Sequence, residues 1–223
     1  MDQILSIAAI IGVTLSYPYT FVTQKNLPDR IPIHFNFKGE PDGYGSKRIL
    51  FLIPILTTLL YIGLRLLPRC DKYKENYAKF KVYLKLFELS FVLFMDFLLY
   101  TAIQACTSNE DIILSVTGAM GLLMIMTGIA VRGSKMTQFF GCKCRYAYLS
   151  EEKWEYINNI GGILMISLGT VLLASVLMGW KFMLFAGIIG LIVGVLIIIG
   201  YSEWLYAKEM RRVQEEQIGN MII

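Results

Sequence analysis

The feature that most constrains this chain is a series of six apolar runs, each close to the length that crosses a bilayer. They occupy roughly residues 4–23, 49–67, 86–106, 112–131, 163–180 and 182–201. A helix rises about 1.5 Å per residue, so about 20 apolar residues span the roughly 30 Å hydrocarbon core of a membrane. The runs therefore predict an all-α membrane protein, a bundle of six transmembrane helices.

The composition and motifs favour a membrane protein without enzyme activity. Hydrophobic residues make up 56% of the chain and charged residues 17%, with a mean hydropathy of +0.56. A soluble domain carries about 25% charged residues. The sequence contains no phosphate-binding G-x-x-x-x-G-K-[ST], no H-E-x-x-H and no G-x-S-x-G, and it has a single histidine. We therefore expect no cofactor and no catalytic residue.

The positions of the basic residues predict the orientation. They gather in the connection between the second and third runs, in the connection between the fourth and fifth, and in the C-terminal segment. Cytoplasmic connections carry an excess of Lys and Arg. We therefore predict a multi-pass protein of the cell membrane with both termini inside and the loop 24–48 outside.

The same pattern divides the chain into two halves. Residues 1–106 hold three spans and the outer loop, and residues 107–223 hold three spans, an inner loop at 132–162 and a cytoplasmic tail at 205–223. Ser150 is predicted to cap a short interfacial helix that leads into the fifth span after Gly161 and Gly162. The tail is predicted to form a polar helix from Lys208.

A metal site is not expected. Cys142 and Cys144 form a C-x-C in the inner loop, but a zinc site needs two further ligands. The one histidine, His34, falls on the predicted opposite side of the membrane.

The outer loop reads LPDRIPIHFNFKGEPDGYGSK from Leu27 to Lys47. Its apolar residues alternate with other residue types at Ile31, Ile33, Phe35 and Phe37, which predicts a short strand with one apolar face. The glycines and Pro41 that follow are expected to supply turns. A lone strand is unstable, so it needs a partner strand or a seat on the helix bundle.

Four polar side chains in this loop are candidates for binding a ligand: His34, Asn36, Glu40 and Asp42. The alternative is that Asn36 and Asp42 hold turns and that His34 is an ordinary surface residue. A third hypothesis, a membrane enzyme, requires His34, Glu40 and Asp42 to converge within a few ångströms.

A second candidate site lies in the third span, where Glu88, Asp96 and Gln104 interrupt apolar residues. Asp96 falls near the middle of the membrane, where an ionised carboxylate costs about 2.5–3.5 kcal/mol on insertion scales. The three residues are predicted to line a polar seam, and a small ion- or proton-coupled transporter centred on Asp96 is the alternative function. Otherwise Asp96 is a packing residue that bonds Thr57, Thr58, Ser167 or Thr170, and Glu88 pairs with Lys85.

Two segments resemble the Sdp immunity protein (SdpI) family of bacterial membrane proteins. In the outer loop the resemblance rests on Leu27-Pro28, Ile33, His34-Phe35-Asn36, Gly39-Glu40-Pro41-Asp42 and Lys47. In the inner loop it rests on Gly141, Ser150-Glu151-Glu152, Trp154 and Gly161-Gly162, with Lys143 and Tyr146 in place of an arginine and a tryptophan. Cys144, Arg145 and Asn158 depart from the pattern.

The resemblance implies a six-helix membrane protein that protects against, or senses, a secreted membrane-active peptide toxin. It implies a peptide toxin as the partner outside, bound by His34, Asn36, Glu40 and Asp42. It also implies a cytoplasmic transcriptional repressor as the partner inside. Our candidate signalling residues on that side are Lys143, Arg145 and Trp154. The lipid bilayer is then the remaining partner, and no direct contact with nucleic acid is expected.

Overall fold

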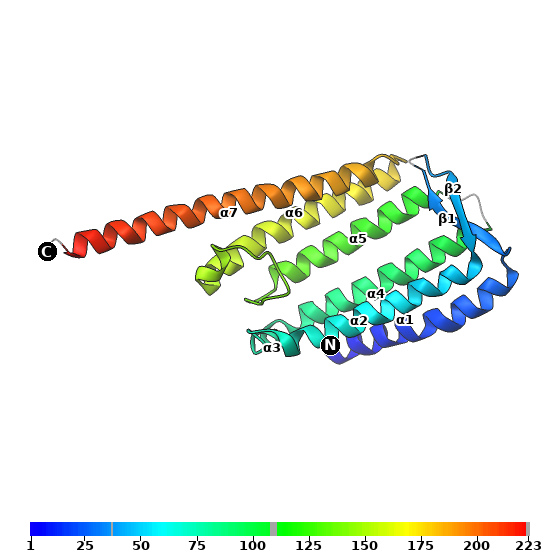
Figure 1. Cartoon of the computed structure of the whole chain (residues 1–223), viewed down its shortest axis with the longest axis horizontal. Helices are drawn as coiled ribbons and strands as arrows, with labels where there is room; N and C mark the ends of the chain where they lie inside the picture. The colour runs from blue at the N-terminus through cyan, green and yellow to red at the C-terminus, as the bar shows by residue number, and fades with distance from the viewer. Residues whose placement is uncertain (37, 108–110, 222–223) are drawn as a thin grey trace.

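The computed structural model describes residues 1–36, 38–107 and 111–221. Six long helices lie side by side in an elongated bundle (Figure 1), and each is long and apolar enough to cross a membrane. They are α1 (Asp2–Thr23), α2 (Leu52–Cys70), α4 (Lys81–Gln104), α5 (Ile112–Arg132), α6 (Glu151–Leu177) and α7 (Met183–Met221). The predicted six-helix membrane fold is confirmed.

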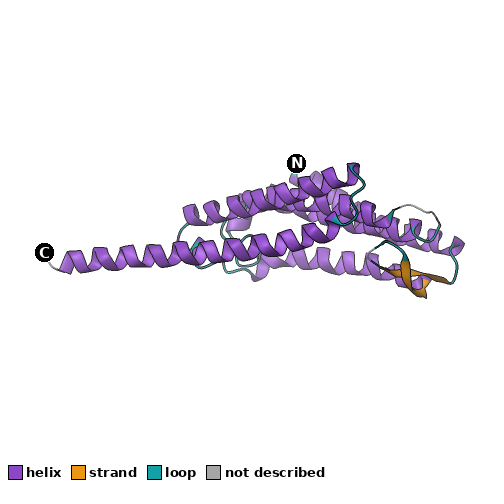
Figure 2. Ribbon diagram, turned by 90° about the horizontal axis from the view of Figure 1, so that it is seen from above, coloured by secondary structure: helices purple, strands orange, loops and turns teal. Residues whose placement is uncertain are grey.

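The two ends of the bundle differ. One end, the hairpin end, carries a two-stranded sheet together with the 3-10 turns Gln24–Asn26 and Lys47–Phe51. The other, the basic end, carries the N-terminus, the short helix α3 (Asn76–Lys79) and the connection 133–150 with its turn Ala147–Leu149. Helix α7 extends well past the other helices at the basic end (Figure 2).

The predicted strand has a partner strand. β1 (Arg30–Phe35) pairs antiparallel with β2 (Pro41–Ser46), and each strand is an edge of this two-stranded sheet. The expectation that residues 41–45 form only turns was therefore wrong. Gly43 and Gly45 lie opposite β1, where side chains of that strand fold across them: a Cβ on Gly45 would meet Ile33 Cδ1 at 2.9 Å.

The single apolar face predicted for β1 is only partly present. Ile31 is buried, but Ile33 is 46% exposed. The register shifts on both sides of His34, so strict alternation between the two faces is lost there. The fourth residue of the pattern, Phe37, lies outside the described residues.

The predicted interfacial helix and the fifth span form one helix, α6. Ser150 caps it as expected, because its hydroxyl accepts the Lys153 N–H at 3.2 Å, and the helix runs unbroken through Gly161 and Gly162. Gly162 allows close packing against α5. A Cβ on Gly162 would lie 2.5 Å from the Gly128 carbonyl oxygen of α5.

Close helix contacts of this kind organise the second half of the bundle. Gly121 of α5 meets Gly169 of α6 in the same way as Gly128 meets Gly162. Helix α7 then packs on α6 through glycines that receive leucine side chains, with Gly187, Gly190 and Gly194 facing Leu172, Leu168 and Leu164. In the first half α1 and α2 pack on α4, and α4 joins the two halves by packing on α5.

Candidate functional site

The hairpin is seated firmly on the bundle. Leu27, Ile31 and Leu50 are buried in one cluster with Leu99 and Ile103, which lie in the last turns of α4. The turn of the hairpin reaches the other half of the molecule, because a Cβ on Gly39 would meet the Ile113 side chain of α5 at 3.3 Å. The hairpin thus rests on both α4 and α5.

Lys47, which is part of the family-like motif, ties the base of the hairpin. Its ammonium donates to the Leu27 carbonyl oxygen at 2.9 Å and lies 3.2 Å from the Asp29 carboxylate. Only a quarter of the Lys47 side chain is exposed. This lysine therefore shapes the loop more than it presents a charge to a ligand.

The structure brings two of the predicted ligand-binding residues together on the hairpin surface. His34 Nδ1 lies 2.5 Å from Asp42 Oδ1 across the strand pair. A carboxylate only accepts, so Nδ1 carries the proton of this hydrogen bond. The His34 side chain is 71% exposed, which leaves Nε2 accessible to a ligand.

The other two candidates form a second pair at the turn. The Asn36 amide donates to Glu40 Oε2 at 3.0 Å, and its oxygen accepts the N–H groups of Lys38 and Glu40 at 2.9 and 3.1 Å. Asn36 therefore holds the turn, as the structural alternative predicted, and it also orients the Glu40 carboxylate.

The convergence required by the enzyme hypothesis is not formed. His34 meets Asp42, whereas Glu40 turns to Asn36. Among residues 1–36, 38–107 and 111–221, no three His, Cys, Asp or Glu side chains are grouped so as to hold a metal ion. Burial raises the pKa of the Cys142 thiol, which disfavours the thiolate that a metal would need.

Asp96 lies in the middle of α4 and faces α1. A Cβ on Gly12 would lie 2.8 Å from Asp96 Oδ2, so glycine makes room for the carboxyl group. Asp96 Oδ1 is buried and has no hydrogen-bond partner among the described residues. The hydroxyls of Thr57, Thr58 and Thr170 instead bond carbonyls of their own helices.

Glu88 and Gln104 are engaged by neighbours other than Asp96. Both Glu88 oxygens accept from the Lys85 ammonium, at 2.6 and 2.7 Å, as the pairing alternative predicted. Gln104 donates to the Tyr100 hydroxyl at 2.7 Å near the hairpin end. The three residues therefore do not join into the single seam that their spacing suggested.

Of the three predicted signalling residues, Trp154 is not on the surface. It is completely buried against Ala147 and Ile157, and its indole N–H donates to the Ser134 carbonyl at 3.3 Å. Trp154 thus holds the 133–150 connection onto α6.

Lys143 and Arg145 are exposed, as a contact surface requires. Arg145 forms a two-pronged ion pair with Glu203 of α7. Lys153 of α6 reaches Glu209, further along α7, at 2.6 Å. These two ion pairs, called the tail clasp below, fasten the extended part of α7 to the inner loop and the start of α6.

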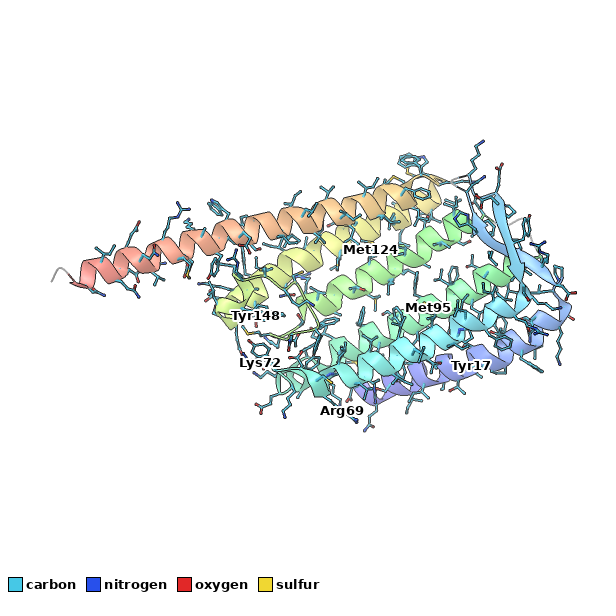
Figure 3. The ribbon with its side chains drawn as sticks, in the orientation of Figure 1. Tyr17, Arg69, Lys72, Met95, Met124 and Tyr148 are labelled. Atoms are coloured by element: carbon cyan, nitrogen blue, oxygen red, sulfur yellow. The ribbon has the colours of Figure 1, made fainter. Side chains whose placement is uncertain are left out.

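Sequence reasoning missed Asp71, which joins the two loops of the basic end. Its carboxylate accepts the Tyr73 N–H at 2.7 Å, the Tyr77 hydroxyl at 2.6 Å and the Gln138 N–H at 2.8 Å. The stacked rings of Tyr73 and Tyr148, 6.1 Å apart, add a second link. Figure 3 shows Lys72 and Tyr148 together at this end. The available signal was a lone acid directly after a span and followed by tyrosines.

Comparisons with known proteins match both candidate regions. A domain of unknown function (DUF1648) matches residues 6–58, which include the hairpin, and the SdpI/YfhL protein family matches residues 134–202, which include the inner loop and α6. An uncharacterised protein of Archaeoglobus fulgidus is 34% identical over 50 residues, which is 22% of this chain and 27% of that protein. The chain thus spans little more than a quarter of that relative. No solved structure matches.

Proposed function

Because the chain belongs to the SdpI/YfhL protein family, we propose that it is an immunity or sensor protein for a secreted membrane-active peptide. In this proposal the hairpin end faces the outside of the cell and binds the peptide. The basic end faces the cytoplasm and reports the binding event to a regulator.

The observation that carries this proposal is the way the hairpin is mounted. It presents two ordered polar pairs, His34–Asp42 and Asn36–Glu40, while Ile31 is buried in a cluster with Leu99 and Ile103 of α4. A rigid support with exposed polar groups suits recognition of a peptide, since little ordering is needed when the ligand binds.

The same mounting supports a route for a signal. The turn of the hairpin touches α5 at Ile113, and α5 is locked to α6 by glycine contacts at two levels. A ligand that shifts the hairpin would therefore move α5 and α6 together. Helix α6 begins at the inner loop, where the tail clasp holds α7, so movement there would alter the surface around Lys143 and Arg145.

A survival assay tests the proposal. The chain is expressed in a toxin-sensitive strain, and survival is scored against candidate peptide toxins. We expect the double substitution His34→Ala with Asn36→Ala to abolish protection, because it removes one partner from each polar pair. Arg48→Ala, which removes an exposed charge at the base of the hairpin, is the matched control and should protect like the unsubstituted chain. Full protection by the double variant at equal membrane abundance would reject the hairpin as the binding surface.

A transporter remains the second candidate, favoured by the buried Asp96 Oδ1, which has no hydrogen-bond partner within the part of the chain that the structure describes. Such an atom is suited to bind a proton or an ion. Asp96→Asn should abolish flux of the transported ion in a transporter but leave peptide protection intact in an immunity protein. Measuring both in the same cells separates the two functions.

A further inference from the structure

A polar cavity opens at the basic end between the first three long helices. Its volume is about 320 Å³, and α1, α2 and α4 each contribute to its wall. The polar groups that line it are Asp2, Gln3, Ser6, Arg65, Lys81 and Lys85. It is separate from the hairpin and from the inner loop, so the proposed function does not account for it.

The cations of this cavity outnumber the carboxylates that face them. Lys81 lies 2.5 Å from Asp2, and Lys85 satisfies both oxygens of the buried Glu88. Arg65 forms a longer ion pair with the same carboxylate, at 3.6 Å from a Glu88 oxygen, so three cations share the two carboxylates of Asp2 and Glu88. The cavity thus carries one positive charge in excess.

The Arg65 guanidinium has more N–H donors than its hydrogen bond to Ser6 uses. A guanidinium has five N–H groups. The bond that Arg65 forms is to the Ser6 hydroxyl at 3.2 Å, and 41% of its side chain is exposed. A planar guanidinium with free N–H groups suits two-pronged binding of a phosphate.

Exposed apolar side chains are present on the helices that form the cavity. Ile7 of α1 lines it and is 57% exposed, and Leu66 and Ile62 of α2 are 44% and 48% exposed. Basic pockets between transmembrane helices at the cytoplasmic boundary bind the head groups of anionic lipids. We propose that this cavity binds the phosphate of an anionic phospholipid, whose acyl chains lie along the exposed apolar faces of α1 and α2. The single negative charge of a phosphodiester balances the excess charge.

Lipid binding to the purified protein tests this assignment. The detergent-solubilised chain is titrated with phosphatidylglycerol, with phosphatidylcholine and with inorganic phosphate, and bound lipid is counted by native mass spectrometry. We expect phosphatidylglycerol to bind in preference to the other two. Arg65→Gln should weaken that binding about fivefold or more, the effect of about 1 kcal/mol for one basic residue at a lipid surface.

Three further variants complete the test. Arg65→Lys keeps the charge but loses the planar guanidinium. Its affinity for phosphatidylglycerol should lie between that of the unsubstituted chain and that of Arg65→Gln. Lys81→Gln changes a side chain that is 57% exposed, and should also weaken binding. Lys74→Gln removes an exposed charge from the same end outside the cavity, and should leave binding unchanged. Equal loss with Lys74→Gln and Arg65→Gln, equal binding of phosphatidylcholine, or inorganic phosphate binding as tightly as phosphatidylglycerol would each overturn the assignment.

Discussion

At the scale of single residues, Asp71 joins the two loops of the basic end by hydrogen bonds. It accepts three hydrogen bonds from two different loops. In Asp71→Asn an N–H₂ group replaces one acceptor oxygen and faces a donor, so the buried bonds of a charged group are lost. We expect a loss of about 1.5–3 kcal/mol in the free energy of unfolding.

The measurement for Asp71→Asn is thermal unfolding in detergent, compared with Asp29→Asn. Asp29 pairs with Lys47, but its side chain is 96% exposed, so its substitution should change the free energy by less than about 1 kcal/mol. Equal melting temperatures for the two variants would contradict the role given to Asp71.

The pH dependence of stability gives a second test of Asp71. Burial opposes its charge, but the Tyr77 hydroxyl and the N–H groups of Tyr73 and Gln138 outweigh this and hold the pKa of Asp71 below its usual 3.8. A carboxyl group whose pKa is lower in the folded state stabilises the fold above the unfolded value and loses that contribution as the pH falls through the folded value. The melting temperature should therefore fall below pH 3.8 more steeply for the unsubstituted chain than for Asp71→Asn.

The sequence predicted residue partners only where they are close in the chain. The Lys85–Glu88 pair is one helical turn apart and was foreseen, as was the capping role of Ser150. The hydrogen bond from the Gln138 N–H to Asp71 joins residues far apart in the chain, so no local sequence pattern predicts it. The complete burial of Trp154 was missed for the same reason, because it depends on how the connection 133–150 folds back on α6.

At the scale of helices, the contact between α5 and α6 requires glycine. A Cβ on Gly128 would lie 2.6 Å from the Gly162 carbonyl oxygen, and backbone cannot move aside as a flexible side chain can. Gly128→Ala should therefore push the helices apart and cost about 1–3 kcal/mol. Gly63→Ala in α2 is the control, because nothing lies within 4 Å of its Cβ position.

Thermal unfolding separates the two glycine variants. Alanine favours a helix over glycine, so Gly63→Ala should match or exceed the stability of the unsubstituted chain. If Gly128→Ala is as stable as Gly63→Ala, the close packing of α5 on α6 is not required.

The tail clasp governs the extended part of α7. Surface ion pairs contribute about 0–1 kcal/mol each, so Glu203→Gln with Glu209→Gln should barely change the melting temperature. The tail should nevertheless open more often and be cut faster by trypsin after Arg211 or Arg212. Glu216→Gln, which breaks only the pair with Arg212 inside α7, is the control and should be cut at the rate of the unsubstituted chain. Unchanged cleavage of the double variant would show that packing alone holds the tail.

Elements were predicted well where hydrophobicity decides and poorly where glycine does. The six helices follow from their apolar length. Gly162 was expected only to join an interfacial helix to the fifth span, and Gly43 and Gly45 suggested turns, but these residues allow close approach of α5 to α6 and of β1 to β2. In a single sequence, a glycine at a turn and a glycine at a close contact between elements look the same. Only the neighbours of the glycine in space distinguish the two roles.

At the scale of the whole molecule, the fold separates two chemically distinct ends. The hairpin end presents paired polar side chains on a rigid support, and the basic end joins its loops through Asp71 and fastens α7 through the tail clasp. The helices between them are long enough to place these ends on opposite sides of a membrane. The account of function depends on which end is outside.

Cysteine labelling in living cells tests that dependence most directly. Lys38→Cys places a thiol on the hairpin, Lys143→Cys places one on the inner loop, and the unsubstituted chain with its own four cysteines gives the background. We predict that a membrane-impermeant maleimide labels Lys38→Cys above background in intact cells, and that Lys143→Cys is labelled above background only after the cells are permeabilised. Labelling of Lys143→Cys in intact cells, with Lys38→Cys protected, would place the hairpin in the cytoplasm and contradict the account.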